Sequence, residues 1–151
     1  MTVTIRPAKA RDAQAISSLI VGLAGYFVAD PGSLEVAPFM ETLSPEATAG
    51  RIAAPEFEYF VAEDARGLRG VIAIRDGTHV YHLFVDSTAH RQGIARTLWD
   101  HVRTRSKQKI FTVNSSLFAV PVYERLGFEP TQSVQTKNGL MFVPMEYRDD
   151  R

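Results

Sequence analysis

Cysteine is absent from this 151-residue chain, which excludes disulfides, thiolate metal sites and thiol nucleophiles together. The chain also lacks a net charge, because 17 basic residues balance 17 acidic ones. A neutral chain has no broad electrostatic surface for nucleic acid or anionic lipid, and we expect neither as a partner. The pattern Gly-x4-Gly-Lys-Ser/Thr does not occur either, which excludes a nucleotide-binding protein of the P-loop kind.

Long hydrophobic runs are missing as well. No stretch of about 18 apolar residues occurs, so we expect no membrane span. The first residues, Met1-Thr-Val-Thr-Ile-Arg-Pro, do not follow the basic-then-apolar pattern of a secretion signal, and we expect a cytoplasmic protein. Hydrophobic residues make up 45% of the chain and charged residues 23%, which is typical of a globular protein. The length predicts a single domain over residues 1–151.

The first third of the chain predicts one strand and two helices. Thr2 to Arg6 alternates like a strand, and Asp12 is a candidate N-cap for a helix. Apolar residues follow at helical spacing: Ile16, Leu19, Ile20 and Leu23. Ser44 and Pro45 are typical of a second helix start. A Ser side chain caps a free backbone N–H group there, and Pro has no N–H group that would be left unpaired at the first helical position. The stretch between these helices, 26–43, shows no clear period.

The rest of the chain predicts strands interrupted by two helices. Strands are expected at 57–63, 70–74, 78–86 and 110–114, with two more around the turn Lys137-Asn138-Gly139. Helices are expected at 93–107 and 118–126, the second ended by Gly127. The order is therefore β-α-α-β-β-β-α-β-α-β-β. It indicates an α/β protein of the α+β type, with a mixed, largely antiparallel central sheet and flanking helices.

One strand–loop–helix junction, Leu83 to Ala95, has the features of a phosphate site. The predicted helix start gathers free backbone N–H groups at the positive end of the helix dipole. Gly93 and Ala95 leave room for a ligand near the backbone, and Arg91 adds a positive charge. From these features alone, a plain connection between strand and helix is an equally good interpretation.

Val85 to Ala95 also resembles the acetyl-CoA loop of GNAT acetyltransferases, whose pattern is Arg or Gln, two residues, Gly, one residue, then Gly or Ala. Gly93 and Ala95 match this pattern, whereas His90 stands where the family has Arg or Gln. Downstream, the segment from Val113 to Phe128 resembles the family's closing motif, a strand and a helix ending in Tyr-Glu-x-x-Gly-Phe. The residues that match this motif are Ala119, Tyr123, Gly127 and Phe128.

The resemblance implies a GNAT-like fold and acetyl-CoA as cosubstrate, with no metal. In the family, two adjacent strands diverge and the pantetheine arm of coenzyme A fills the gap; here these are the strands at Phe84 and near Asn114. Seven residues before the tyrosine, where many members carry Asn, this chain has Ser116, so either Asn114 or Ser116 reaches the arm. The implied cosubstrate-binding residues are Phe84, Val85, His90, Arg91, Gln92, Gly93, Ile94, Ala95, Asn114 and Ser116.

Two side chains are candidates for the chemistry, Tyr123 from the resemblance and His82 from its place on the strand. Tyr123 is expected to act as general acid toward the departing coenzyme A thiolate, the alternative being a core aromatic residue. His82 is a candidate general base, because histidine titrates near neutrality, or else a structural histidine. Strict alternation places His82 on one face of its strand with Val80 and Phe84, and Tyr81 on the other.

The resemblance leaves the acceptor open: a small-molecule or peptide amine, with a homodimer as one possible assembly. The aromatic residues Tyr26, Phe27 and Phe39 precede the sheet where the family builds its acceptor site, and they either shape that site or pack in the core. A different class is a non-catalytic acyl-CoA sensor or interaction module with the same fold.

Overall fold

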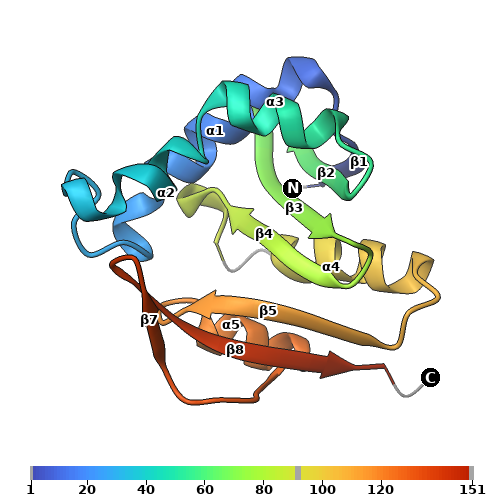
Figure 1. Ribbon diagram of the computed structural model, residues 1–151. Coiled ribbons are helices and arrows are strands. Elements are labelled where there is room, and N and C mark those ends of the chain that lie inside the picture. The colour runs from blue at the N-terminus through green and yellow to red at the C-terminus, as the bar shows by residue number, and fades with distance from the viewer. Residues whose placement is uncertain (1, 91–92, 150–151) are drawn as a thin grey trace.

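The computed structural model describes residues 2–90 and 93–149 and is built around one sheet (Figure 1). The helices are α1 (Ala13–Gly22), α2 (Ala37–Glu41), α3 (Pro45–Ala53), α4 (Ile94–Arg105) and α5 (Val120–Leu126). The strands are β1 (Thr4–Pro7), β2 (Phe57–Asp64), β3 (Gly67–Arg75), β4 (His79–Val85), β5 (Ile110–Ser116), β6 (Glu129–Pro130), β7 (Gln135–Lys137) and β8 (Leu140–Arg148).

The sheet has the order β1-β2-β3-β4-β5-β8-β6, with β7 paired to β8. Among the described strands, the pair β4 and β5 is parallel and every other pair is antiparallel. The mixed, largely antiparallel sheet predicted from the sequence is confirmed. Two elements were missed: α2 is too short to show a helical period, and the two-residue β6 contains Pro130, which favours a sheet edge.

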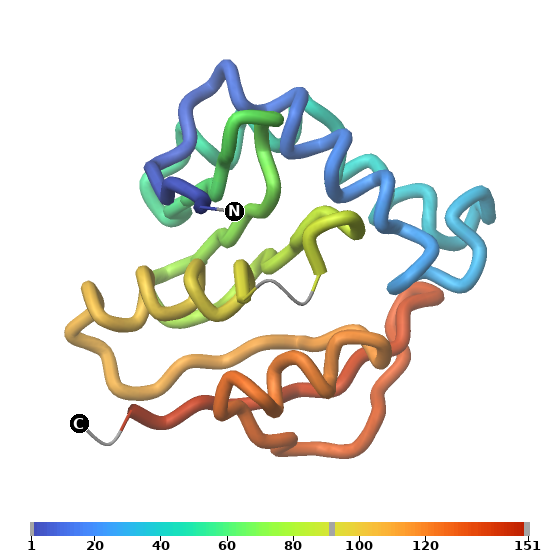
Figure 2. Tube along the Cα trace, turned by 180° about the vertical axis from the view of Figure 1, so that it is seen from behind, coloured from blue at the N-terminus to red at the C-terminus, as the bar shows by residue number. Residues whose placement is uncertain are grey.

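Two hydrophobic clusters hold helices against the two faces of the sheet. On one face, α1 and α3 cover a cluster that includes Ile16, Ile20, Leu43, Tyr59, Val61, Val71 and Ala73. On the other face, α4 and α5 lie over the two halves of the sheet (Figure 2). Trp99 of α4 is fully buried there and contacts the rings of Phe111, Phe128 and Tyr147.

The strands β4 and β5 diverge in the middle of the sheet. They pair at His79–Thr112 and Val80–Val113, and no pairing continues beyond Val80 among the described residues. Figure 1 shows the two strands side by side where they begin and apart where they end. β3 stays paired with β4, and β8 stays paired with β5, along the diverging parts of these strands. Each half of the sheet therefore stays intact while a gap opens between β4 and β5.

A β-bulge in β4 changes which residues share a face. Ala73 of β3 pairs with His82, but the next residue, Ile74, pairs with Val80, so Tyr81 is the extra residue. Consequently His82 lies on the α1 face with Phe84, and Val80 lies in the cluster on the α4 face. The expectation that Val80 and His82 share a face was wrong, because a single inserted residue reverses the alternation on one side of it.

Asp12 begins α1 without the side-chain capping bond expected from the sequence. Its carboxylate instead accepts hydrogen bonds from the guanidinium group of Arg6 at 2.8 and 2.9 Å and from the N–H of Lys9 at 2.7 Å. The same guanidinium group binds Glu63 of β2 at 2.8 Å, so one arginine joins β1, β2 and the start of α1.

Asp12→Asn is expected to lower the free energy of unfolding by about 1–3 kcal/mol at neutral pH, because it removes a charge-assisted contact of a buried carboxylate. Arg6 holds the pKa of the Asp12 carboxyl below its ordinary value. This stabilisation is therefore present above the unfolded-state pKa and disappears as pH falls through the lower folded-state pKa. Urea unfolding of both proteins should show a difference that shrinks in acid; a difference independent of pH would contradict the ion pair.

Candidate active site

Two cavities open from the gap between β4 and β5. The first, of about 780 Å³, is bounded by the start of α4 and by α5, and we call it the α4-side cavity. The second, of about 480 Å³, is bounded by the β7–β8 hairpin and by Phe39 of α2, and we call it the hairpin-side cavity. Six residues line both: Phe27, Leu83, Phe84, Ser116, Ala119 and Tyr123. The two cavities therefore meet at the gap.

The start of α4 forms one wall of the α4-side cavity. Gly93, Ile94 and Ala95 line it, as predicted, while Arg91 and Gln92 lie outside the described residues. Gly93 has a φ of 76°, a left-handed conformation that favours glycine, and among the described residues no atom outside its chain neighbours and its own helix backbone lies within 4 Å of the place a Cβ would occupy. The first N–H groups of this 12-residue helix thus border an open space.

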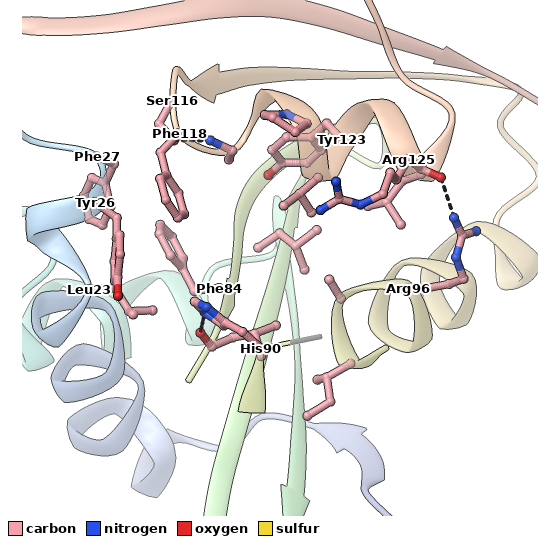
Figure 3. Close-up of a pocket in the computed structure, with 18 of the residues that line it drawn as sticks. Leu23, Tyr26, Phe27, Phe84, His90, Arg96, Ser116, Phe118, Tyr123 and Arg125 are labelled. Atoms are coloured by element: carbon pink, nitrogen blue, oxygen red, sulfur yellow. Dashed lines mark hydrogen bonds between the residues drawn. The ribbon is translucent and has the colours of Figure 1, made fainter. Parts of the chain in front are cut away.

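Two arginines add positive charge to this wall. Arg96 and Arg125 both line the α4-side cavity, and the guanidinium group of Arg96 donates a hydrogen bond to the carbonyl oxygen of Arg125. Figure 3 shows this bond joining α4 to α5 and the side chain of Arg125 directed into the cavity. Helix N–H groups and guanidinium groups together are the donors that a pyrophosphate requires, so the residues present fit that group.

His90 takes a position that the family pattern gives to Arg or Gln. Its Nε2 hydrogen-bonds to the carbonyl oxygen of Val85 at 2.8 Å, and its ring lies 6.2 Å from that of Tyr26. Tyr26 in turn stacks on Phe118 with ring centroids 4.7 Å apart, and both side chains are about half exposed. This aromatic pair lies at one side of the cavity in Figure 3, and no sequence motif singled out Phe118.

The edge of β4 that faces the gap carries Phe84 and Val85, and both residues line the α4-side cavity. Across the gap, Ser116 lines both cavities, whereas Asn114 lines the hairpin-side cavity alone. The Ser116 hydroxyl also accepts a hydrogen bond from the N–H of Ala119 at 3.2 Å. Of the two candidates left open by the sequence, Ser116 is thus the one that borders the α4-side cavity.

Tyr123 of α5 lies where the cavities join. Its side chain is 6% exposed, packs edge-on against Phe128 at 5.4 Å, and in Figure 3 points its hydroxyl oxygen into the cavity. Burial raises the pKa of the Tyr123 phenol above its ordinary value. The phenol therefore keeps its proton at neutral pH and can act as a donor, not as a base.

His82 lines the hairpin-side cavity but is 7% exposed, surrounded by the rings of Tyr59, Tyr81 and Phe84. Burial, assisted by the positive charge of Arg51, lowers the pKa of His82 to about 3. Its Nε2 atom is buried without a hydrogen-bond partner among the described residues. The imidazole is therefore neutral at physiological pH, with no ionisation near neutrality.

Other lining residues of the hairpin-side cavity were only partly anticipated. Phe27 and Phe39 line it and also pack against the core, with the Phe27 ring 5.2 Å from that of Phe84, whereas Tyr26 lines only the α4-side cavity. Arg75 and Lys137 line it too. The sequence places Lys137 in a predicted turn and singles out no role for Arg75, because no local pattern indicates that these two residues share a cavity.

Comparisons with known proteins agree with this geometry. Similar solved structures include an N-acetyltransferase from Rhodopseudomonas palustris, with a TM-score of 0.81, 20% identity and coverage of 98% of this chain and 96% of that one. For PaiA N-acetyltransferase from Thermoplasma acidophilum, in complex with coenzyme A, the TM-score is 0.77 and the identity 18%, with coverage of 98% of this chain and 99% of that one. For a chimera of spermidine N-acetyltransferase SpeG from Vibrio cholerae and hSSAT, the TM-score is 0.67 and the identity 19%, with coverage of 98% of this chain and 96% of that one. At these identities the likeness shows the fold.

A family model described as an acetyltransferase (GNAT) domain matches residues 27–148. The chain belongs to the GNAT acetyltransferase family, because this match spans most of its length. The resemblance drawn from the two motifs is thereby confirmed. No curated protein sequence matches the chain.

Within the part of the chain that the structure describes, no helix is both long and apolar enough to cross a membrane.

Proposed function

We propose that this protein transfers the acetyl group of acetyl-CoA to a primary amine, by direct attack of the amine while both substrates are bound. The observation that carries the proposal is the meeting of two cavities at Tyr123, one bordered by a helix N-terminus and the other closed by the β7–β8 hairpin. Each cavity accommodates one substrate, and the gap between β4 and β5 lets the reacting atoms meet.

The α4-side cavity is proposed to bind coenzyme A. The N–H groups at Gly93 to Ala95, with Arg96 and Arg125, would hold the pyrophosphate. The loop residues His90, Arg91 and Gln92 and the strand residues Phe84 and Val85 complete the proposed binding set, with Ser116 on the opposite side. The free edge of β4 offers hydrogen-bonding groups to the pantetheine arm, and a backbone N–H near Val85 would stabilise negative charge on the thioester oxygen.

Tyr123 is proposed as the general acid. Attack of the neutral amine forms the carbon–nitrogen bond; when the carbon–sulfur bond then breaks, the electron pair stays on sulfur, and the Tyr123 hydroxyl donates a proton to it. The nitrogen loses its surplus proton to water as the amide forms, and water returns a proton to the Tyr123 phenolate. Because its pKa is raised, the Tyr123 phenol is protonated, and able to donate, at every working pH. Burial also raises the pKa of the coenzyme A thiol, so proton transfer from the phenol to the thiolate does not become much more unfavourable.

His82 is proposed to position the amine, which differs from the role of proton acceptor considered from the sequence. An aliphatic ammonium group has a pKa near 10.4, so transfer of its proton to a base with a pKa of about 3 is uphill by roughly 10 kcal/mol. We infer that the amine loses its proton to water before attack. The Nε2 of His82, buried without a partner among the described residues, would then accept a hydrogen bond from the neutral amine once the surrounding rings move to admit it.

His82→Ala is expected to lower kcat/KM by about tenfold or less, the value of one neutral hydrogen bond. The acidic limb of the pH profile should be the same in both proteins, because burial keeps the His82 pKa at about 3. Loss of an ionisation near neutrality in the variant would instead establish His82 as the general base.

The transfer itself is tested by incubating the purified protein and acetyl-CoA with a library of primary amines and following the release of free thiol. We expect thiol release that depends on the amine, together with a matching acetylated product. Binding of acetyl-CoA without turnover of any amine would favour the alternative of a non-catalytic acyl-CoA sensor.

A further inference from the structure

The hairpin-side cavity has a positively charged wall. Arg75 and Lys137 line it and carry positive charge, and the neutral imidazoles of His79 and His82 line it as well. No aspartate or glutamate is among the described residues that line it. An acidic group does lie nearby: Asp76 stands 3.7 Å from Arg75, with both side chains well exposed.

Two guanidinium groups flank one aromatic ring in this wall. The Cζ atoms of Arg51 and Arg75 lie 5.2 and 5.8 Å from the ring centroid of Tyr81, the residue inserted by the bulge. Arg51 is fixed by hydrogen bonds to the Tyr59 hydroxyl and to the carbonyl of Thr42, both at 2.7 Å. Among the described residues, the Arg75 guanidinium group contacts the Tyr81 ring and has an exposed ion pair with Asp76 at 3.7 Å, so N–H groups at its edge are available to a ligand.

The positive charge of this wall acts on its own neighbours. The pKa of His79 is lowered by burial and, next, by Arg75, and the pKa of His82 is lowered by burial and then by Arg51. A second ammonium group on an acceptor would meet the same repulsion. A carboxylate would be attracted, and a guanidinium group binds it through two parallel hydrogen bonds.

Apolar side chains form a large part of the remaining lining of the cavity, beside the polar residues Thr42, Asn114, Ser115 and Ser116. The apolar side chains include Phe27, Phe39, Leu140, Met141 and Phe142. The turn of the hairpin packs against the residues just before α2: a Cβ at Gly139 would lie 2.9 Å from the Glu35 side chain and 3.1 Å from that of Val36. A volume of about 480 Å³ suits a molecule of the size of an amino acid.

Resting on the function proposed above, we propose that the acceptor is an amine that also carries a carboxylate and an apolar body, such as a free amino acid, and that Arg75 binds the carboxylate. The apolar lining holds the body of the molecule, and the amine points to the gap at Tyr123. A polyamine, in contrast, would place its additional ammonium groups against a wall of like charge.

The test compares amines with and without the carboxylate: phenylalanine with phenethylamine, and lysine with cadaverine. Because the amines of a pair differ in their own pKa, the decisive quantity is the ratio of their kcat/KM values and its change in Arg75→Gln. We expect this ratio to fall by about 10- to 100-fold in Arg75→Gln for at least one pair. Lys107→Gln, which removes an exposed positive charge outside both cavities, should leave the ratio unchanged.

The outcomes separate this proposal from the one on which it rests. Unchanged coenzyme A affinity and melting temperature in Arg75→Gln would show that the cosubstrate site and the fold are intact. Turnover of these amines with ratios that do not respond to Arg75→Gln, or a preference for spermidine over every carboxylate-bearing amine, would overturn the acceptor class alone. A ratio that responds to Lys137→Gln and not to Arg75→Gln would overturn the assignment to Arg75. No turnover of any amine would overturn the transferase function as well.

Discussion

Replacing Tyr123 by phenylalanine is expected to slow acetyl transfer by about 10²–10⁴, the usual contribution of a positioned general acid. The change removes one oxygen and keeps the ring that packs on Phe128, so the fold should survive. The affinity for acetyl-CoA should stay within a few-fold. The loss corresponds to roughly 3–5 kcal/mol of transition-state stabilisation, more than one neutral hydrogen bond normally contributes.

The measurement is a single turnover with enzyme in excess, because product release can limit kcat and hide the chemical step. Tyr147→Phe is a matched control: it deletes the same oxygen from a tyrosine of the same aromatic cluster that lines neither cavity. It should transfer at the normal rate. If Tyr123→Phe lowers only the melting temperature, with turnover per folded molecule intact, Tyr123 is a packing residue and the general-acid role is wrong.

Gly93→Val is the second substitution with a large expected effect, a loss of about 10- to 100-fold in affinity for coenzyme A. A β-branched residue at a φ of 76° is strained by about 1–3 kcal/mol, and its side chain would occupy the open space that the helix N–H groups border. Both effects act on the pyrophosphate-binding wall. Titration calorimetry of the unsubstituted protein should also show much weaker binding of pantetheine, which lacks the pyrophosphate, than of coenzyme A.

Gly67→Val provides the control for strain alone. Gly67 has a φ of 115° with open space around it, and it is the first residue of β3, outside both cavities. Its replacement should lower stability as Gly93→Val does and leave coenzyme A binding unchanged. Equal affinities for coenzyme A and pantetheine would mean that the start of α4 does not hold the pyrophosphate.

Local patterns were sufficient where a short segment carries its own physical signal. Ser44 caps α3 by accepting a hydrogen bond from the N–H of Ala47 at 3.1 Å, with Pro45 at the first helical position. Gly127 ends α5 in the left-handed conformation, with a φ of 103°. At Asp12 the same kind of signal was misleading, because Arg6, close in space through β1, competes for the carboxylate.

The sequence by itself determined the order of most elements, the glycine at the start of α4 and the two motifs that identify the family, because each depends on residues near one another in the chain. Tertiary structure alone decided the bulge at Tyr81, which turns His82 toward the α1 face, and the burial that makes this histidine neutral at physiological pH. It also decided that Arg75 and Lys137, more than sixty residues apart, line one cavity. Register, burial and cavity walls arise from contacts between distant segments, and a local pattern of residue types carries no record of them.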